Sequence, residues 1–150
     1  MDMLFLMDPL DRADPERDTT WALMREACAR GHRAHFALAD DLSLQGGTPW
    51  IRSRAVHVPA SGASFRWEEE ARWREVSDFP IVWLRTDPPF DDRYLEATWI
   101  LERVDRSRCL VLNDPAGVRA ANEKHYALRF PEICPTTIVT ADRARLRAFV

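Results

Sequence analysis

The sequence has 150 residues, of which 46% are hydrophobic and 10% aromatic. This is enough apolar material for the core of one domain and argues against disorder of the whole chain. The formal net charge of -3 excludes the basic surface that neutralises phosphates along a nucleic acid. No stretch approaches the ~20 apolar residues that a membrane helix needs, and the acidic start of the chain does not resemble a signal peptide. We therefore expect a cytoplasmic protein with neither a nucleic-acid nor a membrane partner.

The cysteines and histidines predict no metal or disulfide site. Cys28, Cys109 and Cys134 are far apart and form no CxxC pair, so neither a disulfide framework nor a zinc site is expected and a reducing compartment is indicated. His32 and His35 are three residues apart but have no carboxylate or thiol partner in the nearby sequence. We therefore expect no metal site in this chain.

The start of the chain predicts a β-α-β unit. Residues 3–7 form a short apolar run that stops at a proline-containing turn, which is typical of a buried strand. Asp18 or Thr19 then caps a helix whose apolar residues follow helical spacing as far as Gly31. Residues 33–38 are the next strand candidate. Such a unit favours parallel pairing of its strands with a right-handed crossover, so an α/β fold is expected.

The next segment departs from this alternation. Residues 42–58 predict a β-hairpin, because two alternating runs flank Gly46 and Gly47. We expect the hairpin to stand as an excursion from the main sheet. Residues 60–78 are polar, contain two tryptophans six residues apart and predict no clear element. Glu68 to Glu70 are interpreted as a solvated face.

The second half of the chain alternates strands and helices again. The predicted strands are short apolar runs at residues 81–84, 109–112 and 136–140. The predicted helices begin at Asp91 or Asp92, run from Asn113-Asp114-Pro115 through Asn122 to Pro131, and close the chain over residues 141–150. Together with the first half, this order predicts a mostly parallel sheet flanked by helices.

The residues that follow each strand are the candidate functional site, because ligands of open parallel sheets bind beyond the carboxyl ends of the strands. Arg85 is the most informative of them, since it follows four apolar residues and its guanidinium can bind a carboxylate through two parallel hydrogen bonds. The alternative is that Arg85 pairs with Asp87 and only holds its own loop. The chain has no glycine-rich phosphate loop, no serine nucleophile elbow and no HExxH helix. It therefore contains no complete catalytic constellation.

Several motifs give the chain a resemblance to a known family over nearly its whole length. They are Met7-Asp8-Pro9, Asp18-Thr19-Thr20, Leu84 to Asp91 with the run RTDPPF, Tyr94 to Glu102, Asn113-Asp114-Pro115 and Arg119 to Lys124. With these motifs the chain resembles the N-terminal domain of the bacterial-type glutathione synthetase, an ATP-grasp ligase. The run RTDPPF is the most specific of them, and the match is poorest at residues 60–78.

The resemblance implies a Rossmann-like pre-ATP-grasp domain over residues 1–150. Its core is expected over about residues 1–122, and residues 123–150 are expected to lead into an ATP-grasp region that this chain lacks. Members of this family join γ-glutamylcysteine to glycine through an acyl-phosphate made from ATP with Mg²⁺, and a homo-oligomer is implied. ATP and Mg²⁺ are expected to be bound mostly by the missing region.

The same resemblance assigns roles to individual residues. Lys124, the one lysine of the chain, is expected to contact an ATP phosphate. Arg85 is expected to hold a carboxylate of the peptide substrate, with Asp87 and Thr20 in the same substrate site. No catalytic residue and no metal ligand is implied for this chain.

Two alternatives stay open at the level of sequence. The chain could be a stand-alone, non-catalytic module that binds peptides or mediates oligomerisation. It could also be part of another ATP-grasp carboxylate-amine ligase, such as one that acts on protein or peptide ends. The final predicted helix has neither a capping glycine nor a polar tail, from which we expect an incomplete chain that is inactive alone.

Overall fold

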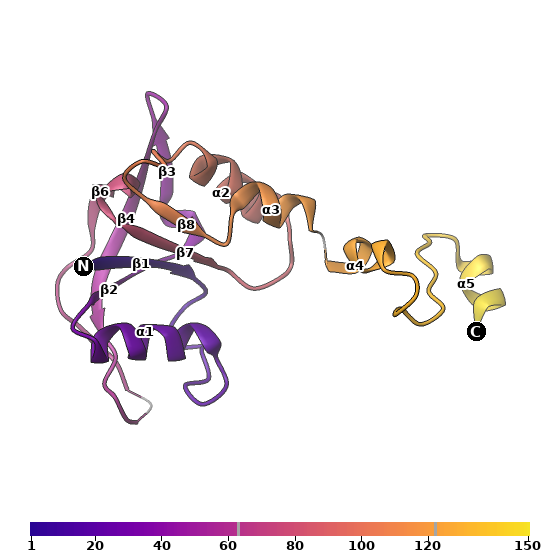
Figure 1. Ribbon diagram of the computed structural model, residues 1–150, viewed down its shortest axis with the longest axis horizontal. Coiled ribbons are helices and arrows are strands. Elements are labelled where there is room, and N and C mark those ends of the chain that lie inside the picture. Colours follow the sequence, from indigo (N-terminus) through magenta and orange to yellow (C-terminus); the bar gives the residue numbers. More distant parts are fainter. Residues whose placement is uncertain (63, 122) are drawn as a thin grey trace. The chain divides into compact units, whose positions relative to one another are not determined.

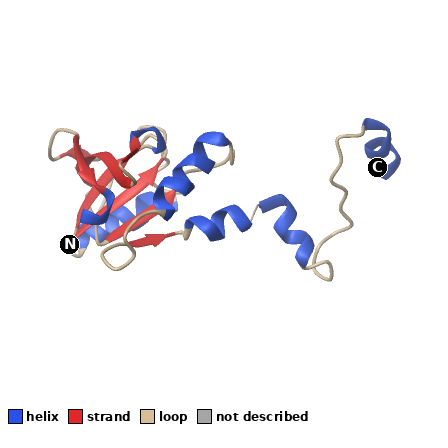
Figure 2. Cartoon of the chain, turned by 90° about the horizontal axis from the view of Figure 1, so that it is seen from above, coloured by secondary structure: helices blue, strands red, loops and turns tan. Residues whose placement is uncertain are grey.

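The computed structural model describes residues 1–62, 64–121 and 123–150, with the side chains of residues 123 and 124 left aside. The chain divides into two compact units, Met1–Arg119 and Ala120–Val150. Figure 2 shows strands in the first unit, whereas the described part of the second consists of helices and loops.

The first unit is built on one twisted sheet, in which the described residues supply eight strands. The strands are β1 (Asp2–Met7), β2 (Arg33–Ala37), β3 (Leu42–Gln45), β4 (Thr48–His57), β5 (Arg66–Trp67), β6 (Arg72–Glu75), β7 (Ile81–Arg85) and β8 (Leu110–Leu112). Their order is β3-β4-β2-β1-β7-β8, and β5 and β6 both pair with β4. The pairs β1–β2, β1–β7 and β7–β8 are parallel, and the pairs of β4 are antiparallel.

Helices cover both faces of this sheet (Figure 1). They are α1 (Thr19–Ala29), α2 (Asp92–Glu102) and α3 (Pro115–Ala120), with the 3₁₀ turns η1 (Ala39–Asp41) and η2 (Val76–Asp78). Both longer helices begin where the sequence predicts, because Asp18 and Asp91 cap them through their side chains. The predicted α/β class, with a sheet flanked by helices, is therefore confirmed. The sheet is mixed rather than mostly parallel, because β4 joins β2 in antiparallel orientation and also pairs with β3, β5 and β6 in that orientation.

Alternation along β1 divides the core into two layers, since successive side chains of a strand point to opposite faces. Leu4 and Leu6 pack in a cluster with Leu101 of α2, whereas Phe5 packs in a cluster with Trp21 of α1. All of these side chains are essentially inaccessible to solvent. Each such burial contributes about 1.5–3 kcal/mol, so both helices are held firmly on the sheet.

The hairpin predicted at residues 42–58 is present as β3 and β4, with a turn at Gly46 and Gly47, both of which have positive φ. It differs from the expected excursion, because the second half of β4 joins the main sheet. Ala34 of β2 pairs with Val56 of β4. Ten residues make β4 long enough to form the hairpin at one end and to extend the sheet at the other.

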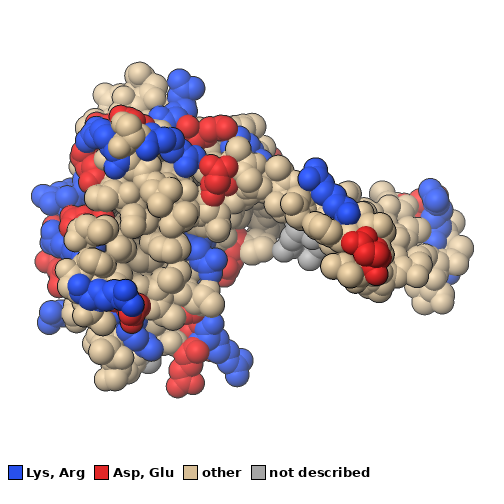
Figure 3. Space-filling view, viewed as in Figure 1, with Lys and Arg blue, Asp and Glu red and all other residues tan. Residues whose placement is uncertain are grey.

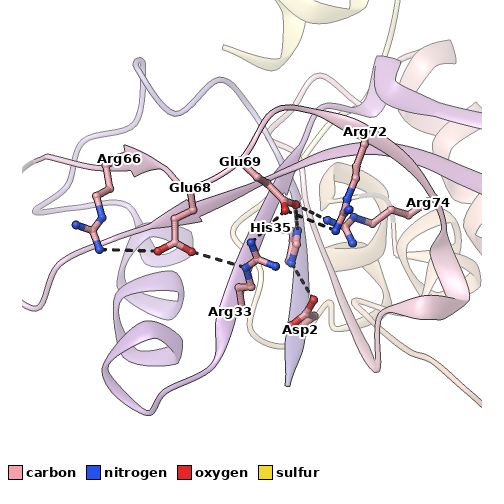
Figure 4. Close-up of polar contacts among 8 residues, drawn as sticks. All are labelled: Asp2, Arg33, His35, Arg66, Glu68, Glu69, Arg72 and Arg74. Carbon is pink, nitrogen blue, oxygen red and sulfur yellow. Dashed lines mark hydrogen bonds and ion pairs between the residues drawn. The ribbon is translucent and has the colours of Figure 1, made fainter.

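Residues 66–75, for which the sequence predicts no clear element, contain β5 and β6, and an ion-pair cluster ties the loop between these two strands to the sheet (Figure 4). Glu69 is the centre of this ion-pair cluster, and only 19% of its side chain is exposed. One carboxylate oxygen accepts a hydrogen bond from Arg74, and the other accepts one from Arg33 at 3.1 Å, with Arg72 at 3.5 Å. The predicted solvated face is therefore wrong for Glu69, because Arg33, 36 residues earlier in the chain, converges on it together with Arg72 and Arg74.

His35 lies inside this cluster and is fully buried. Its Nε2 lies 3.1 Å from Oδ2 of Asp2, and its Nδ1 lies 3.8 Å from Oε1 of Glu69. The expectation that His35 lacks a carboxylate partner is therefore wrong, because the fold brings in one carboxylate from β1 and one from the loop before β6. Burial lowers the pKa of His35, and the charge of Arg74 lowers it further, against the opposite effect of Asp2.

The second unit contains α4 (Glu123–Tyr126), the 3₁₀ turn η3 (Ala127–Arg129) and α5 (Arg143–Phe149), which Asp142 caps. The helix predicted from Pro115 to Pro131 is thus divided into α3, α4 and η3. The strand predicted at residues 136–140 is wrong, since the described residues of this unit contain no strand with which it could pair.

Charged side chains of both signs are interspersed over the face of residues 1–119 that Figure 3 shows. Every helix in the described residues is too short or too polar to cross a bilayer.

Candidate functional site

The candidate site lies at the carboxyl ends of β1 and β7. The chain leaves these two strands toward opposite faces of the sheet, since β1 is followed by α1 and β7 by α2. These strands are neighbours at the centre of the sheet, with Met7 paired to Arg85, while α1 and α2 pack on opposite faces. In open α/β sheets a ligand crevice forms at such a position. Residues 8–9 and 86–90 leave the sheet here and form its rim.

Arg85 is held by the start of α1. Its Nε donates a hydrogen bond to Oγ1 of Thr20 at 3.1 Å, and its Nη2 donates one to Oγ1 of Thr19. The helix start is itself fixed, because Oδ1 of Asp18 accepts hydrogen bonds from the backbone N–H of Thr20 at 2.6 Å and of Trp21 at 3.2 Å. A guanidinium carries five N–H donors, so Arg85 keeps donors for a ligand after both hydroxyls are satisfied.

This arrangement differs from the alternative in which Arg85 pairs with Asp87. Within the described residues no ion pair joins the two side chains, and Arg85 turns instead to hydroxyls that lie 65 and 66 residues earlier in the chain. Asp87 is fixed through its backbone, whose N–H donates to Oδ2 of Asp8 at 2.7 Å. This hydrogen bond ties the loop after β7 to the end of β1.

Two adjoining hollows form one crevice over these residues. The larger, of about 540 Å³, lies toward α1 and includes Thr19, Thr20 and Arg85. The smaller, of about 330 Å³, lies toward α2 and includes Thr86 and Tyr94. We call them the α1 lobe and the α2 lobe. Both lobes are lined by Met7, Asp8, Pro9, Arg12 and Asp87.

Tyr94 gives the α2 lobe a hydrogen-bonding group. Its ring lies against that of Phe90, with centroids 4.9 Å apart. Burial raises the pKa of Tyr94, and the carboxylates of Asp8 and Asp87 act in the same direction, against the guanidinium of Arg85. The hydroxyl therefore stays protonated at neutral pH and can donate a hydrogen bond.

The structure brings together three of the four residues to which the resemblance assigns a role. Arg85 and Thr20 are in direct contact, and Asp87 lines the same lobe. Lys124 is in α4 of the second unit, and its side chain lies outside the described residues. Neither Thr19 nor Tyr94 was assigned to the site from the sequence, although both stand in motifs next to predicted site residues.

The described residues offer no ligand set for a metal ion. Among them, no group of three or more His, Cys, Asp or Glu side chains converges as a metal site requires. We therefore assign no step to a metal in this chain.

Residues 1–119 match the model of the family described as prokaryotic glutathione synthetase, N-terminal domain. The chain belongs to this family. The matched range coincides with the first compact unit, which contains the sheet and the whole crevice. The resemblance seen in the motifs is thus confirmed.

Individual relatives agree with the family. The chain is 40% identical over 159 aligned residues to a glutathione synthetase of Thermosynechococcus vestitus, a match that covers all of this chain and 50% of that protein. It is 39% identical to a glutathione synthetase of Synechococcus elongatus, of which it covers 49%. It is 35% identical to one of Vibrio parahaemolyticus, with 96% of this chain and 46% of that protein covered. The chain therefore spans about half the length of the curated relatives it matches.

Proposed function

We propose that this chain forms the wall that binds the peptide substrate in an ATP-dependent ligase, which joins γ-glutamylcysteine to glycine through an acyl-phosphate. One observation carries the proposal: Arg85 stands at the carboxyl edge of the sheet, held by two hydroxyls of α1, with donors left for a carboxylate. The membership of the family, whose named relatives are glutathione synthetases, supports the same activity.

The chemistry of such a ligase suits what this domain offers. Formation of an acyl-phosphate brings the negative charges of ATP and of a carboxylate together, so positioning and electrostatic stabilisation are the main requirements. A fixed guanidinium supplies both, and no general base is required of these residues. Thr20 acts by holding Arg85, and Asp87 shapes the loop at the rim of the crevice.

The remaining parts of the proposal concern groups beyond the crevice. ATP and Mg²⁺ would be bound mostly by residues outside this chain, and Lys124 would contact an ATP phosphate. Residues 123–150 would lead into that nucleotide-binding region. We further propose a cytoplasmic, homo-oligomeric enzyme, as the resemblance implies.

The test is the ligation of γ-glutamylcysteine to glycine by the full-length protein, followed through the release of phosphate from ATP. Arg85→Lys keeps the positive charge but loses the planar guanidinium, which can bind a carboxylate through two parallel hydrogen bonds. Loss of a charged hydrogen bond costs roughly 1.5–3 kcal/mol, so the KM for γ-glutamylcysteine should rise about 10-fold or more. The KM values for glycine and ATP should change little.

The matched control is Arg30→Lys, at the opposite end of α1, where Arg30 is exposed and pairs only with Glu26 in the described structure. This variant should behave like the unchanged protein. A change of less than about twofold in the KM of Arg85→Lys would contradict the role of Arg85, and a full-length protein without ligase activity would contradict the proposed function itself.

A further inference from the structure

We infer that the crevice recognises the zwitterionic head of an α-amino acid, with Arg85 binding its α-carboxylate and Asp8 binding its α-ammonium. This inference rests on the proposed function and identifies Asp8 as the residue that selects the γ-glutamyl end of the substrate.

The register of the sheet places Asp8 and Arg85 at the ends of neighbouring strands, where both line the α1 lobe. Met7 pairs with Arg85 across parallel strands, so Asp8 follows immediately at the end of the neighbouring strand. Adjacent strands lie about 4.8 Å apart. An α-amino acid carries its ammonium and its carboxylate on one carbon, so complementary groups on neighbouring strands can contact both at once.

Asp8 is the carboxylate of the α1 lobe that is both fixed and still available. Oδ2 of Asp8 accepts the backbone N–H of Asp87 at 2.7 Å, which sets the orientation of the carboxylate. No described residue donates a hydrogen bond to its Oδ1. The other acidic side chains of the lobe either have a partner already or are not held in place. Asp18 caps α1, and Oδ2 of Asp14 lies 3.8 Å from Nε of Arg17, whereas Asp87 is exposed on its loop.

The position of Asp8 between the two lobes adds to this argument. Asp8 is half-buried and lines both hollows, whereas Arg85 lines the α1 lobe. Arg12 also lines both lobes, but its side chain is exposed. A ligand with a carboxylate on Arg85 would therefore bring its α-ammonium to Asp8, while the rest of the molecule occupies the crevice.

Selection follows from the cost of leaving Asp8 without its partner. A substrate that lacks the α-ammonium would cover a half-buried carboxylate with an apolar CH₂ group, and a polar group desolvated without compensation disfavours binding. Sites built to pair a polar group reject analogues without that group strongly. The crevice should therefore prefer γ-glutamylcysteine over glutarylcysteine, its analogue without the α-ammonium.

The test compares these two dipeptides as substrates of the full-length protein, with and without Asp8→Asn. The amide oxygen of the new side chain can still accept the N–H of Asp87, so the loop keeps its anchor while the charge is lost. We expect the KM for γ-glutamylcysteine to rise about 10-fold or more, and the KM for glutarylcysteine to stay within about twofold. The preference between the two substrates should therefore collapse.

Asp11→Asn is the matched control, because Asp11 is exposed on the same loop and is not among the residues that line either lobe of the described chain. It should leave both KM values unchanged. An equal rise for both dipeptides in Asp8→Asn would show a merely structural role, and no rise for either would show that Asp8 does not contact the substrate. Both results overturn the inference while leaving the ligase activity established, whereas absence of ligation by the unchanged protein would refute the proposed function.

Discussion

The ion-pair cluster around Glu69 should carry a measurable part of the stability of this chain. Glu69→Gln removes one negative charge from a site where only 19% of the side chain is exposed and where Arg33 and Arg74 both donate to it. Hydrogen bonds to a charged group contribute about 1.5–3 kcal/mol each, and the amide oxygen of glutamine can keep one of them in weaker form. We therefore expect the free energy of unfolding to fall by about 2–3 kcal/mol.

Urea-induced unfolding of the 150-residue chain, followed by tryptophan fluorescence, measures this loss as a lower midpoint at an unchanged slope. Glu70→Gln is the matched control, because the neighbouring side chain is 95% exposed and lies 3.6 Å from Arg54. An exposed pair contributes about 0–1 kcal/mol, so this variant should remain close to the unchanged chain. Equal midpoints for the two variants would refute the idea that the cluster stabilises the folded chain.

Two further predictions concern buried titratable groups. Burial and the charge of Arg74 lower the pKa of His35, so the folded chain disfavours the charged form of this side chain. The free energy of unfolding should therefore be highest above about pH 6.5. Below that pH it should fall by at most about 1.4 kcal/mol per pH unit. His35→Gln should flatten this dependence in urea titrations at several pH values, and His32→Gln should not. Burial also raises the pKa of Cys109 to about 11, so alkylation by iodoacetamide at pH 8, read by mass spectrometry, should be roughly 100-fold slower in the folded chain than in urea. Equal rates in the two states would contradict this.

The parts of the fold that the sequence predicts correctly are those with local signals. The start of α1 follows from the side chain of Asp18, which reaches N–H groups only two and three residues away. The central strands follow from apolar runs such as residues 3–7 and 81–84, because a strand buried on both faces needs little else. Arg85 was found for the same reason, since it is the first polar residue after such a run.

The parts that escaped prediction depend on partners far away in the sequence. Glu69 contacts Arg33 across 36 residues, and Arg85 contacts Thr20 across 65. No spacing rule connects such pairs, because each requires two elements to be placed first. The strand predicted at residues 136–140 is wrong for a related reason. The composition of these residues favours a strand, but a strand also needs a neighbouring strand to pair with. The described part of residues 120–150 contains no such strand.

The contact between Arg85 and α1 links the stability of the fold to the order of the site. A free arginine side chain carries about 2 kcal/mol of rotamer entropy, which a ligand would have to overcome on binding. Thr19 and Thr20 remove much of that freedom beforehand, and they can do so only while Asp18 keeps the first turn of the helix intact. The helix turn that follows the loop after β1 thus orients the residue proposed to bind the substrate. Asp18 should therefore influence affinity through the helix turn that it holds, as well as influencing folding.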